Sequence, residues 1–119
     1  MRRPTSKLRS GYLSGPMSGI PEANHPAFHR LEKKWRRWGW EVINPALINP
    51  DQVPNEHLTA DEARAASIWS DLEGVRDTDV LILMKGWEAS IGGRAEVYTA
   101  RSLNHPVFDA DTGELLTID

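Results

Sequence analysis

One segment, five apolar residues that run without a break from Val80 to Met84, restricts the fold more than any other. A strand buried on both faces of a parallel sheet has this character, because helices cover such a sheet on both sides. The run is far too short to cross a bilayer, which takes roughly 20 residues. The segment therefore predicts a central strand in an α/β fold with a parallel sheet.

Other strand-like segments complete the predicted sheet. They are Leu8–Ser14, Trp40–Ile43, His105–Phe108 and a last extended piece at Leu115–Ile118. Helical segments separate them, and this alternation is typical of α/β folds. We expect a doubly wound, flavodoxin- or Rossmann-like parallel sheet of four or five strands, with helices on both faces. The 119 residues suit a single domain over 1–119, with residues 1–7 as a flexible tail.

Helical spacing and end signals locate three helices. The apolar positions of the first recur every three or four residues, at Phe28, Leu31, Trp35 and Trp38. Asn24 is its candidate cap, Pro26 suits its first turn, and Gly39 ends it. The third helix is predicted over Arg94–Leu103.

The second helix begins at the capping box formed by Thr59 and Glu62. Its predicted buried stripe is Ala65, Ile68, Leu72 and Val75. The segment Ala46–Leu58 before it is predicted to be a loop, long enough to act as a lid or a binding loop. We assign to the core all but one of the five tryptophans, namely Trp35, Trp38, Trp40 and Trp69.

Composition excludes several classes of function. The chain has no cysteine, which removes disulfides, zinc-thiolate sites and thiol nucleophiles. Residues 1–40 carry nine Lys/Arg and two Glu, a net charge of +7, whereas residues 41–119 carry five Lys/Arg and fifteen Asp/Glu, a net charge of −10. The basic segment either contacts phosphates or is a solvated helix face with a solvated Arg2–Arg3 tail, and the second interpretation is favoured. Without an apolar leader, we expect a soluble, cytoplasmic protein that binds no membrane.

Ligands of open α/β sheets bind beyond the carboxyl ends of the strands, and two loops are predicted to meet there. One is Gly15–Gly19, and the other is Lys85–Gly93. The segment just before the predicted helix offers the Ser90 hydroxyl and the backbone N–H groups of Gly92 and Gly93, which suit an anion such as phosphate. The alternative is that Gly92-Gly93 only allows the chain to turn. Trp87, in the same loop, either stacks on a base or packs within the protein.

Two carboxylates and two histidines have both a structural and a functional interpretation. Glu96, in the first turn of its helix, is either a partner of the helix dipole or a catalyst. Asp71 lies within or beside an apolar stripe, so it is either a structural residue that caps a loop or pairs with Arg76 or Arg94, or a functional group. His25 and His29 have the i, i+4 spacing of metal ligands, but no third ligand is evident, and we expect no metal.

Three motifs together resemble the nucleoside 2-deoxyribosyltransferase-like superfamily. They are Tyr12-Leu13-Ser14-Gly15-Pro16, Asp71 with Asp79 eight residues later, and Ser90-x-Gly92-x-x-x-Glu96. The resemblance covers about residues 8–108 with the order and spacing of the family. That superfamily includes the transferases themselves and the 2'-deoxynucleoside 5'-monophosphate N-hydrolases.

The resemblance implies a role for each matching residue. It makes Glu96 the nucleophile that attacks the anomeric carbon, Asp71 the group that assists departure of the base, and Tyr12 the residue that orients the Glu. The substrate-binding positions that it implies are Gly15, Pro16, Ser18, Gly19, Trp87, Ser90, Gly92 and Gly93. It implies no cofactor, and it implies a homodimer or a higher even homo-oligomer, because the family builds its active sites at subunit interfaces.

Ser90 favours a nucleotide substrate within this resemblance. The transferases usually have Asp six residues before the nucleophile, whereas the monophosphate hydrolases have Ser there, as this chain does. A hydroxyl at a helix start accepts a 5'-phosphate that a carboxylate repels. One departure opposes this: Pro16 and Ser18 stand where the hydrolases have Ser and Arg of their phosphate loop. A second departure, Val97-Tyr98 in place of an Ile/Leu-Gly step, implies that the helix packs differently.

We therefore expect an enzyme that cleaves the N-glycosidic bond of a (deoxy)nucleoside 5'-monophosphate through a covalent glycosyl-Glu intermediate. The close alternative is deoxyribosyl transfer between bases on free nucleosides. A non-catalytic nucleotide-binding module is a rival of another class. A nucleic-acid-binding domain that uses the basic first helix is disfavoured by the net charge of −3.

Overall fold

The computed structural model describes residues 1–47 and 59–118, and it contains a four-stranded parallel sheet. The strands are β1 (Ser10–Ser14), β2 (Glu41–Ile43), β3 (Val80–Leu83) and β4 (Val107–Asp109), in the order β2-β1-β3-β4. All three adjacent pairs are parallel. The predicted fold class is confirmed, although each strand is shorter than its predicted segment. The predicted last strand is reduced to one antiparallel bridge, between Phe108 and Leu115.

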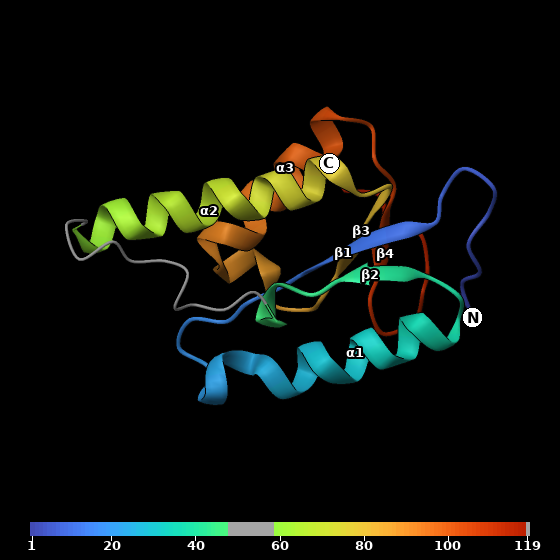
Figure 1. The fold of residues 1–119 in the computed structure, drawn as a ribbon, viewed down its shortest axis with the longest axis horizontal. Helices are drawn as coiled ribbons and strands as arrows, with labels where there is room; N and C mark the ends of the chain where they lie inside the picture. The colour runs from blue at the N-terminus through green and yellow to red at the C-terminus, as the bar shows by residue number, and fades with distance from the viewer. Residues whose placement is uncertain (48–58, 119) are drawn as a thin grey trace.

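Three α-helices cover the sheet on both faces (Figure 1). They are α1 (His25–Arg37), α2 (Ala60–Asp77) and α3 (Ile91–Ser102). Helix α1 lies on one face, and α2 and α3 lie side by side on the other. Among the described residues, short 3-10 turns precede or follow these elements: η1 (Pro21–Asn24), η2 (Pro45–Leu47) and η4 (Trp87–Ala89). None of the helices in the described part of the chain has the length and apolar character of a membrane span.

The apolar run of β3 supplies both halves of the core. Val80 and Ile82 pack with the buried residues of α1, whereas Leu81 and Leu83 pack with Val97 and other buried residues of the opposite face. All of these side chains are buried. This two-sided burial is the reason why the run has no polar position.

The N-terminal residues pack against the α1 side of the sheet. The backbone carbonyl of Arg2 accepts a hydrogen bond from Trp40 Nε1 (2.8 Å), and the Arg2 Nε donates to the carbonyl of Gly113 (2.9 Å). The Arg2 guanidinium lies 4.5 Å from the centre of the Phe108 ring. The expectation of a solvated tail is therefore wrong for Arg2, because the aromatic core offers it a cation–π contact.

Helix α2 buries only part of the predicted stripe, because Val75 is buried and Ile68 and Leu72 are half-buried. Its capping box is confirmed, since Thr59 and Glu62 exchange both hydrogen bonds. However, Ala65 is exposed, and Trp69 keeps 67% of its surface accessible, so their assignment to the core is wrong. The side that faces the sheet passes through the predicted Val75, which is buried, and through Asp71, which is half-buried.

The ends of the other segments also differ from the predictions. Helix α3 begins at Ile91 instead of Arg94, because Ser90 caps it. Asn24 precedes α1, but its side chain makes no capping hydrogen bond. In the predicted loop Ala46–Leu58, residues 46 and 47 belong to η2, and the others lie outside the described residues.

The strand order creates a switch point between β1 and β3. From β1 the chain passes through α1 to β2 on one side, and from β2 it returns through α2 to β3 on the other side. Ligands of open α/β sheets bind beyond the carboxyl ends of the strands at such a point. A ligand site is therefore expected beside the residues at the ends of β1 and β3.

Candidate active site

Four polar side chains gather where β1 ends. Tyr12 and Ser14 alternate along β1 and therefore point to the same face of the sheet, the face that α2 and α3 cover. Asp71 comes from α2, and Glu96 comes from α3. Tyr12, Ser14 and Glu96 are buried, whereas Asp71 is half-buried. Each carboxyl group is hydrogen-bonded to its own hydroxyl group from β1.

The first pair joins Tyr12 to Asp71. The Tyr12 hydroxyl donates to Asp71 Oδ1 over 3.0 Å. Burial, together with the nearby charges of Glu96 and Asp71, raises the pKa of Tyr12, so that the hydroxyl stays protonated and donates. Gly74 lets the Tyr12 ring lie against α2, because a Cβ at position 74 would be 2.6 Å from Tyr12 Cε2. A glycine in the helix interior thus sets the position of Asp71's partner.

The second pair joins Ser14 to Glu96. The Ser14 hydroxyl lies 2.7 Å from Glu96 Oε1. Burial raises the pKa of Glu96 to about 8; the Ser14 hydrogen bond opposes this rise, and the charge of Asp71 adds to it. Burial also raises the pKa of Asp71, against the lowering effect of the Tyr12 hydrogen bond. Two interacting carboxyl groups with raised pKa values are a common feature of sites that perform acid–base or nucleophilic chemistry.

These pairs revise the roles derived from the sequence. The resemblance has Tyr12 orient Glu96, but the Tyr12 hydroxyl is bonded to Asp71, and Ser14 is the partner of Glu96. Ser14 was missed as a site residue, although its position two residues after Tyr12 on one strand was a usable signal. The structural alternative for Asp71 is also wrong in detail, because its partner is neither Arg76 nor Arg94.

Replacing Ser14 by alanine should move the pH profile of Glu96. A hydrogen bond to a charged group is worth about 1.5–3 kcal/mol, which corresponds to about one to two pH units. The limb of log(kcat/KM) against pH that reports ionisation of Glu96 should shift upward by that amount, because the Ser14 hydrogen bond lowers the pKa of Glu96. Ser14→Thr keeps a hydroxyl and should restore much of the profile. A lower rate with an unshifted limb in Ser14→Ala would contradict this role.

Ser90 lies at the start of α3, where its hydroxyl oxygen caps the helix. Ser90 Oγ accepts a hydrogen bond from the Gly93 N–H (3.0 Å), while its own O–H can still donate. Gly93 is buried, and a Cβ there would lie 3.0 Å from the carbonyl oxygen of Trp87. Trp87 is half-buried and packs against the α2–α3 side of the core. The end of this loop is therefore closely packed around a helix N-terminus.

The segment after β1 reaches the same edge of the sheet. A Cβ on Gly15 would lie 2.7 Å from Met84 Cβ, so glycine allows β1 and β3 to end side by side. The carbonyl of Pro16 accepts a hydrogen bond from Asn24 Nδ2 (3.0 Å). Ser18 and Gly19 are exposed, farther along the segment. Gly15 and Pro16 thus border the loop that holds Trp87, whereas Ser18 and Gly19 face solvent.

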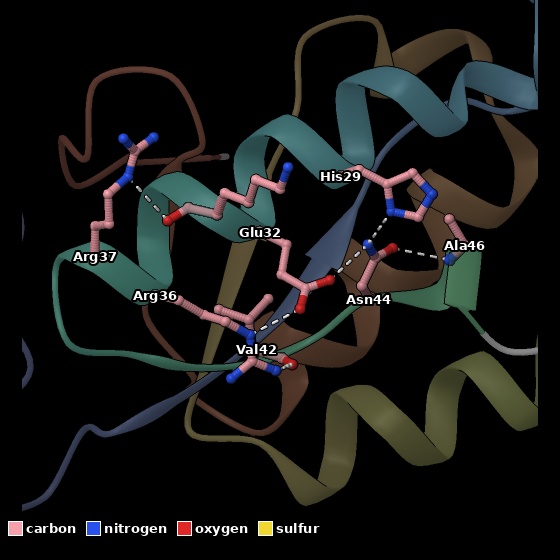
Figure 2. Close-up of polar contacts among 8 residues, drawn as sticks. His29, Glu32, Arg36, Arg37, Val42, Asn44 and Ala46 are labelled. Atoms are coloured by element: carbon pink, nitrogen blue, oxygen red, sulfur yellow. Dashed lines mark hydrogen bonds and ion pairs between the residues drawn. The ribbon is translucent and has the colours of Figure 1, made fainter.

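A second polar network, on the α1 side, fixes the end of β2 (Figure 2). The buried Asn44 donates to Glu32 Oε1 (3.0 Å), and its oxygen accepts from the N–H of Ala46 (2.9 Å). Arg36 bridges Glu32 Oε2 (2.7 Å) and the carbonyl of Val42 (2.9 Å). These bonds satisfy Asn44 internally, so the network holds the chain where it leaves the edge strand β2.

Neither the histidine pair nor Asp79 belongs to the cluster. The rings of His25 and His29 are 6.1 Å apart, and no group of three His, Cys, Asp or Glu within residues 1–47 and 59–118 is arranged to hold a metal. Asp79 accepts hydrogen bonds from the N–H groups of Arg9 (2.9 Å) and Ser10 (3.0 Å). Asp79 therefore fixes the start of β1, the end opposite to the cluster.

Comparisons with known proteins identify a family but no activity. A family model described as a domain of unknown function, DUF4406, matches residues 9–109. This match includes β1 through β4 and all four residues of the cluster. A search of curated proteins gives no significant match.

Proposed function

We propose that this chain, which belongs to the DUF4406 family, cleaves the N-glycosidic bond of a nucleoside 5'-monophosphate, most simply the 2'-deoxy form. The observation that carries the proposal is the pair of carboxyl groups, Glu96 and Asp71, held by Ser14 and Tyr12 at the switch point of the sheet. Cleavage of a glycosidic bond with retention needs such a pair, one group to attack the sugar and one to assist the leaving group.

In the first step, ionised Glu96 attacks C1' of the sugar. A bond forms between a Glu96 oxygen and C1', and the bond from C1' to the base nitrogen breaks, with its electron pair going to the base. Asp71, whose pKa burial raises, protonates the departing base. The buried Tyr12 hydroxyl keeps Asp71 in place and stabilises the carboxylate that remains.

In the second step, the glycosyl ester is released. Water attacks C1', the bond between Glu96 and C1' breaks, and the proton of the water passes to the Asp71 carboxylate. The sugar phosphate leaves, and both carboxyl groups return to their initial states. If a second base takes the place of water, the same intermediate yields transfer instead of hydrolysis.

The 5'-phosphate is assigned to the start of α3. The Ser90 hydroxyl and the Gly92 N–H lie at a helix N-terminus, where unpaired N–H groups and the helix dipole favour an anion. The half-buried Trp87, beside Ser90, is assigned to the base or sugar. What opposes phosphate binding is the other loop, where Pro16 has no N–H and Ser18 is exposed. This observation favours the second candidate function, deoxyribosyl transfer on free nucleosides.

Replacing Ser90 by alanine should affect a nucleoside 5'-monophosphate and a free nucleoside differently. If Ser90 holds the phosphate, kcat/KM for the nucleotide should fall by about one to two powers of ten, since a hydrogen bond to a charged group is worth about 1.5–3 kcal/mol. The free nucleoside should react slowly and be nearly unaffected. Ser90→Asp should repel the phosphate and reverse the preference. Equal losses for both substrates would mean that Ser90 only caps α3 and would contradict the phosphate assignment.

The proposal is tested by incubating the protein with a panel of nucleosides and nucleoside 5'-monophosphates and following free base by chromatography. Release of base from monophosphates supports the hydrolase. Release only from free nucleosides, or only when a second base is present, supports the transferase. Tight binding without release of base would leave a non-catalytic nucleotide-binding module. We further propose that the protein acts in the cytoplasm as a homo-oligomer.

A further inference from the structure

The outer side of α2 and α3 carries large apolar side chains that no described residue covers. Trp69 is 67% exposed and Tyr98 is 73% exposed, and with Leu72 and Leu103 they border a groove of about 310 Å³ between the two helices. Glu73 and Arg76 lie along the same groove. Exposed apolar patches rimmed by charged residues mark sites of protein association.

Helix α2 has apolar residues on two opposite sides. Asp71 and Val75 belong to the side that faces the sheet, and Trp69 lies on the opposite side of the helix. Ala65, Ala66 and Trp69 continue this outer stripe toward the N-terminus, and all three are exposed. The outer side of α2 thus exposes apolar side chains between charged ones, as a surface that meets a partner does.

We propose that this face binds a second copy of the chain, with the two α2 helices packed antiparallel about a two-fold axis near Trp69. The arrangement of the stripe argues for a second copy. Glu62 lies seven residues before Trp69, and Arg76 lies seven residues after it; both are exposed, and within one copy Glu62 accepts from the Thr59 N–H while Arg76 is paired with Asp77. Antiparallel pairing about Trp69 places Glu62 of each copy beside Arg76 of the other, whereas parallel pairing opposes like charges.

The sizes of the side chains in the stripe agree with the same pairing. A two-fold axis at Trp69 places Ala66 opposite Leu72, a small residue facing a large one, and packed helices interdigitate in this way. Each copy also brings a tryptophan next to the groove between α2 and α3 of the other copy. A surface that fits itself in this manner forms an isologous dimer.

The dimer does not depend on the proposed chemistry, although it lies close to the site. Asp71 is two residues after Trp69, and Tyr98 is two residues after Glu96, on the opposite sides of their helices. Pairing would therefore hold firm the two helices that carry the carboxyl groups. Mass and activity are measured separately, so the failure of either proposal can be recognised alone.

The test is the mass in solution, measured by light scattering after size exclusion at a series of concentrations. The wild-type chain should have twice the monomer mass of 13.4 kDa at micromolar concentration. Trp69→Glu should weaken the dimer at least roughly 30-fold in Kd, the effect of losing a central tryptophan. Tyr98→Glu should act in the same direction. Leu115→Glu, at an exposed leucine outside this face, is the matched control and should remain dimeric.

Charge reversal tests the antiparallel pairing. Arg76→Glu alone should weaken the dimer a few-fold, as expected for exposed ion pairs, and adding Glu62→Arg should recover most of that loss. Glu62→Gln, which keeps the capping hydrogen bond and removes the charge, should weaken the dimer without unwinding the start of α2. A monomeric wild-type chain, or a dimer that Trp69→Glu and Tyr98→Glu leave intact, would overturn the proposal. A dimer disrupted by Trp69→Glu but not restored by the double reversal would overturn the two-fold pairing.

Discussion

Replacing Glu96 by glutamine should lower the rate of base release by several powers of ten, on the order of 10⁴-fold or more, because an amide cannot form the glycosyl ester. The substitution keeps the shape of the side chain, so nucleotide binding should persist. Base release is measured by chromatography under single-turnover conditions, and binding is measured by calorimetry. Activity near the wild-type level in Glu96→Gln would contradict the assignment of Glu96 as nucleophile.

The stability of the same variant provides a control for folding. Because burial raises the pKa of Glu96 from 4.5 to about 8, the folded protein binds this proton more tightly than the unfolded chain does. The stabilising contribution of protonated Glu96 is therefore complete below about pH 4.5 and is lost as the pH rises through about 8. Glu96→Gln should abolish this part of the pH dependence of unfolding, and it should be as stable as the wild type near pH 5.

Replacing Asp71 by asparagine should reduce kcat about 10²- to 10⁴-fold for bases that leave poorly, since this is the range for general acid catalysis. Substrates with good leaving groups need less proton donation and should lose much less. Rates are compared across a series of nucleotides whose bases differ in leaving-group pKa. Tyr12→Phe, which removes only the hydrogen bond to Asp71, should give a smaller loss with the same trend. A loss that is uniform across the series would contradict a role for Asp71 as the acid.

The topology of the sheet could be predicted because the sequence of β3 depends directly on it. Its unbroken apolar run reflects burial on two faces, and that condition already requires a parallel sheet with helices on both sides. The start of α2 could also be predicted, because its capping box involves residues that are close in the sequence. The side chains of Thr59 and Glu62 each accept a hydrogen bond from the other's backbone N–H, so the capping box could be predicted from four consecutive residues.

The face that α2 buries could not be predicted with the same success. The stripe from Ala65 to Val75 has helical spacing, but Trp69 and Ala66 give α2 a second apolar side, and periodicity alone does not say which side meets the sheet. In the structure the buried side of α2 carries Val75 in the core, and Asp71 on the same side accepts the hydrogen bond from Tyr12. A carboxylate in an otherwise apolar helix was the sign of that contact.

The role of Ser14 was hidden for a related reason. Its partner, Glu96, is 82 positions away in the chain, and a serine at the end of a strand has many uses. Only the packing of α3 against β1 shows that this hydroxyl meets the buried carboxyl group. The same packing explains why Tyr12, two residues earlier, reaches Asp71 on α2 instead of Glu96 on α3.

The central claim is the covalent intermediate on Glu96, and mass spectrometry of the acid-quenched protein tests it most directly. The wild-type chain is mixed with excess deoxynucleoside 5'-monophosphate, quenched within the first turnovers and digested. The account predicts a mass increase of one deoxyribose phosphate unit on the peptide that contains Glu96, and no such adduct in Glu96→Gln. Rapid base release by the wild-type chain with no adduct at any quench time, or with an adduct on another residue, would contradict it.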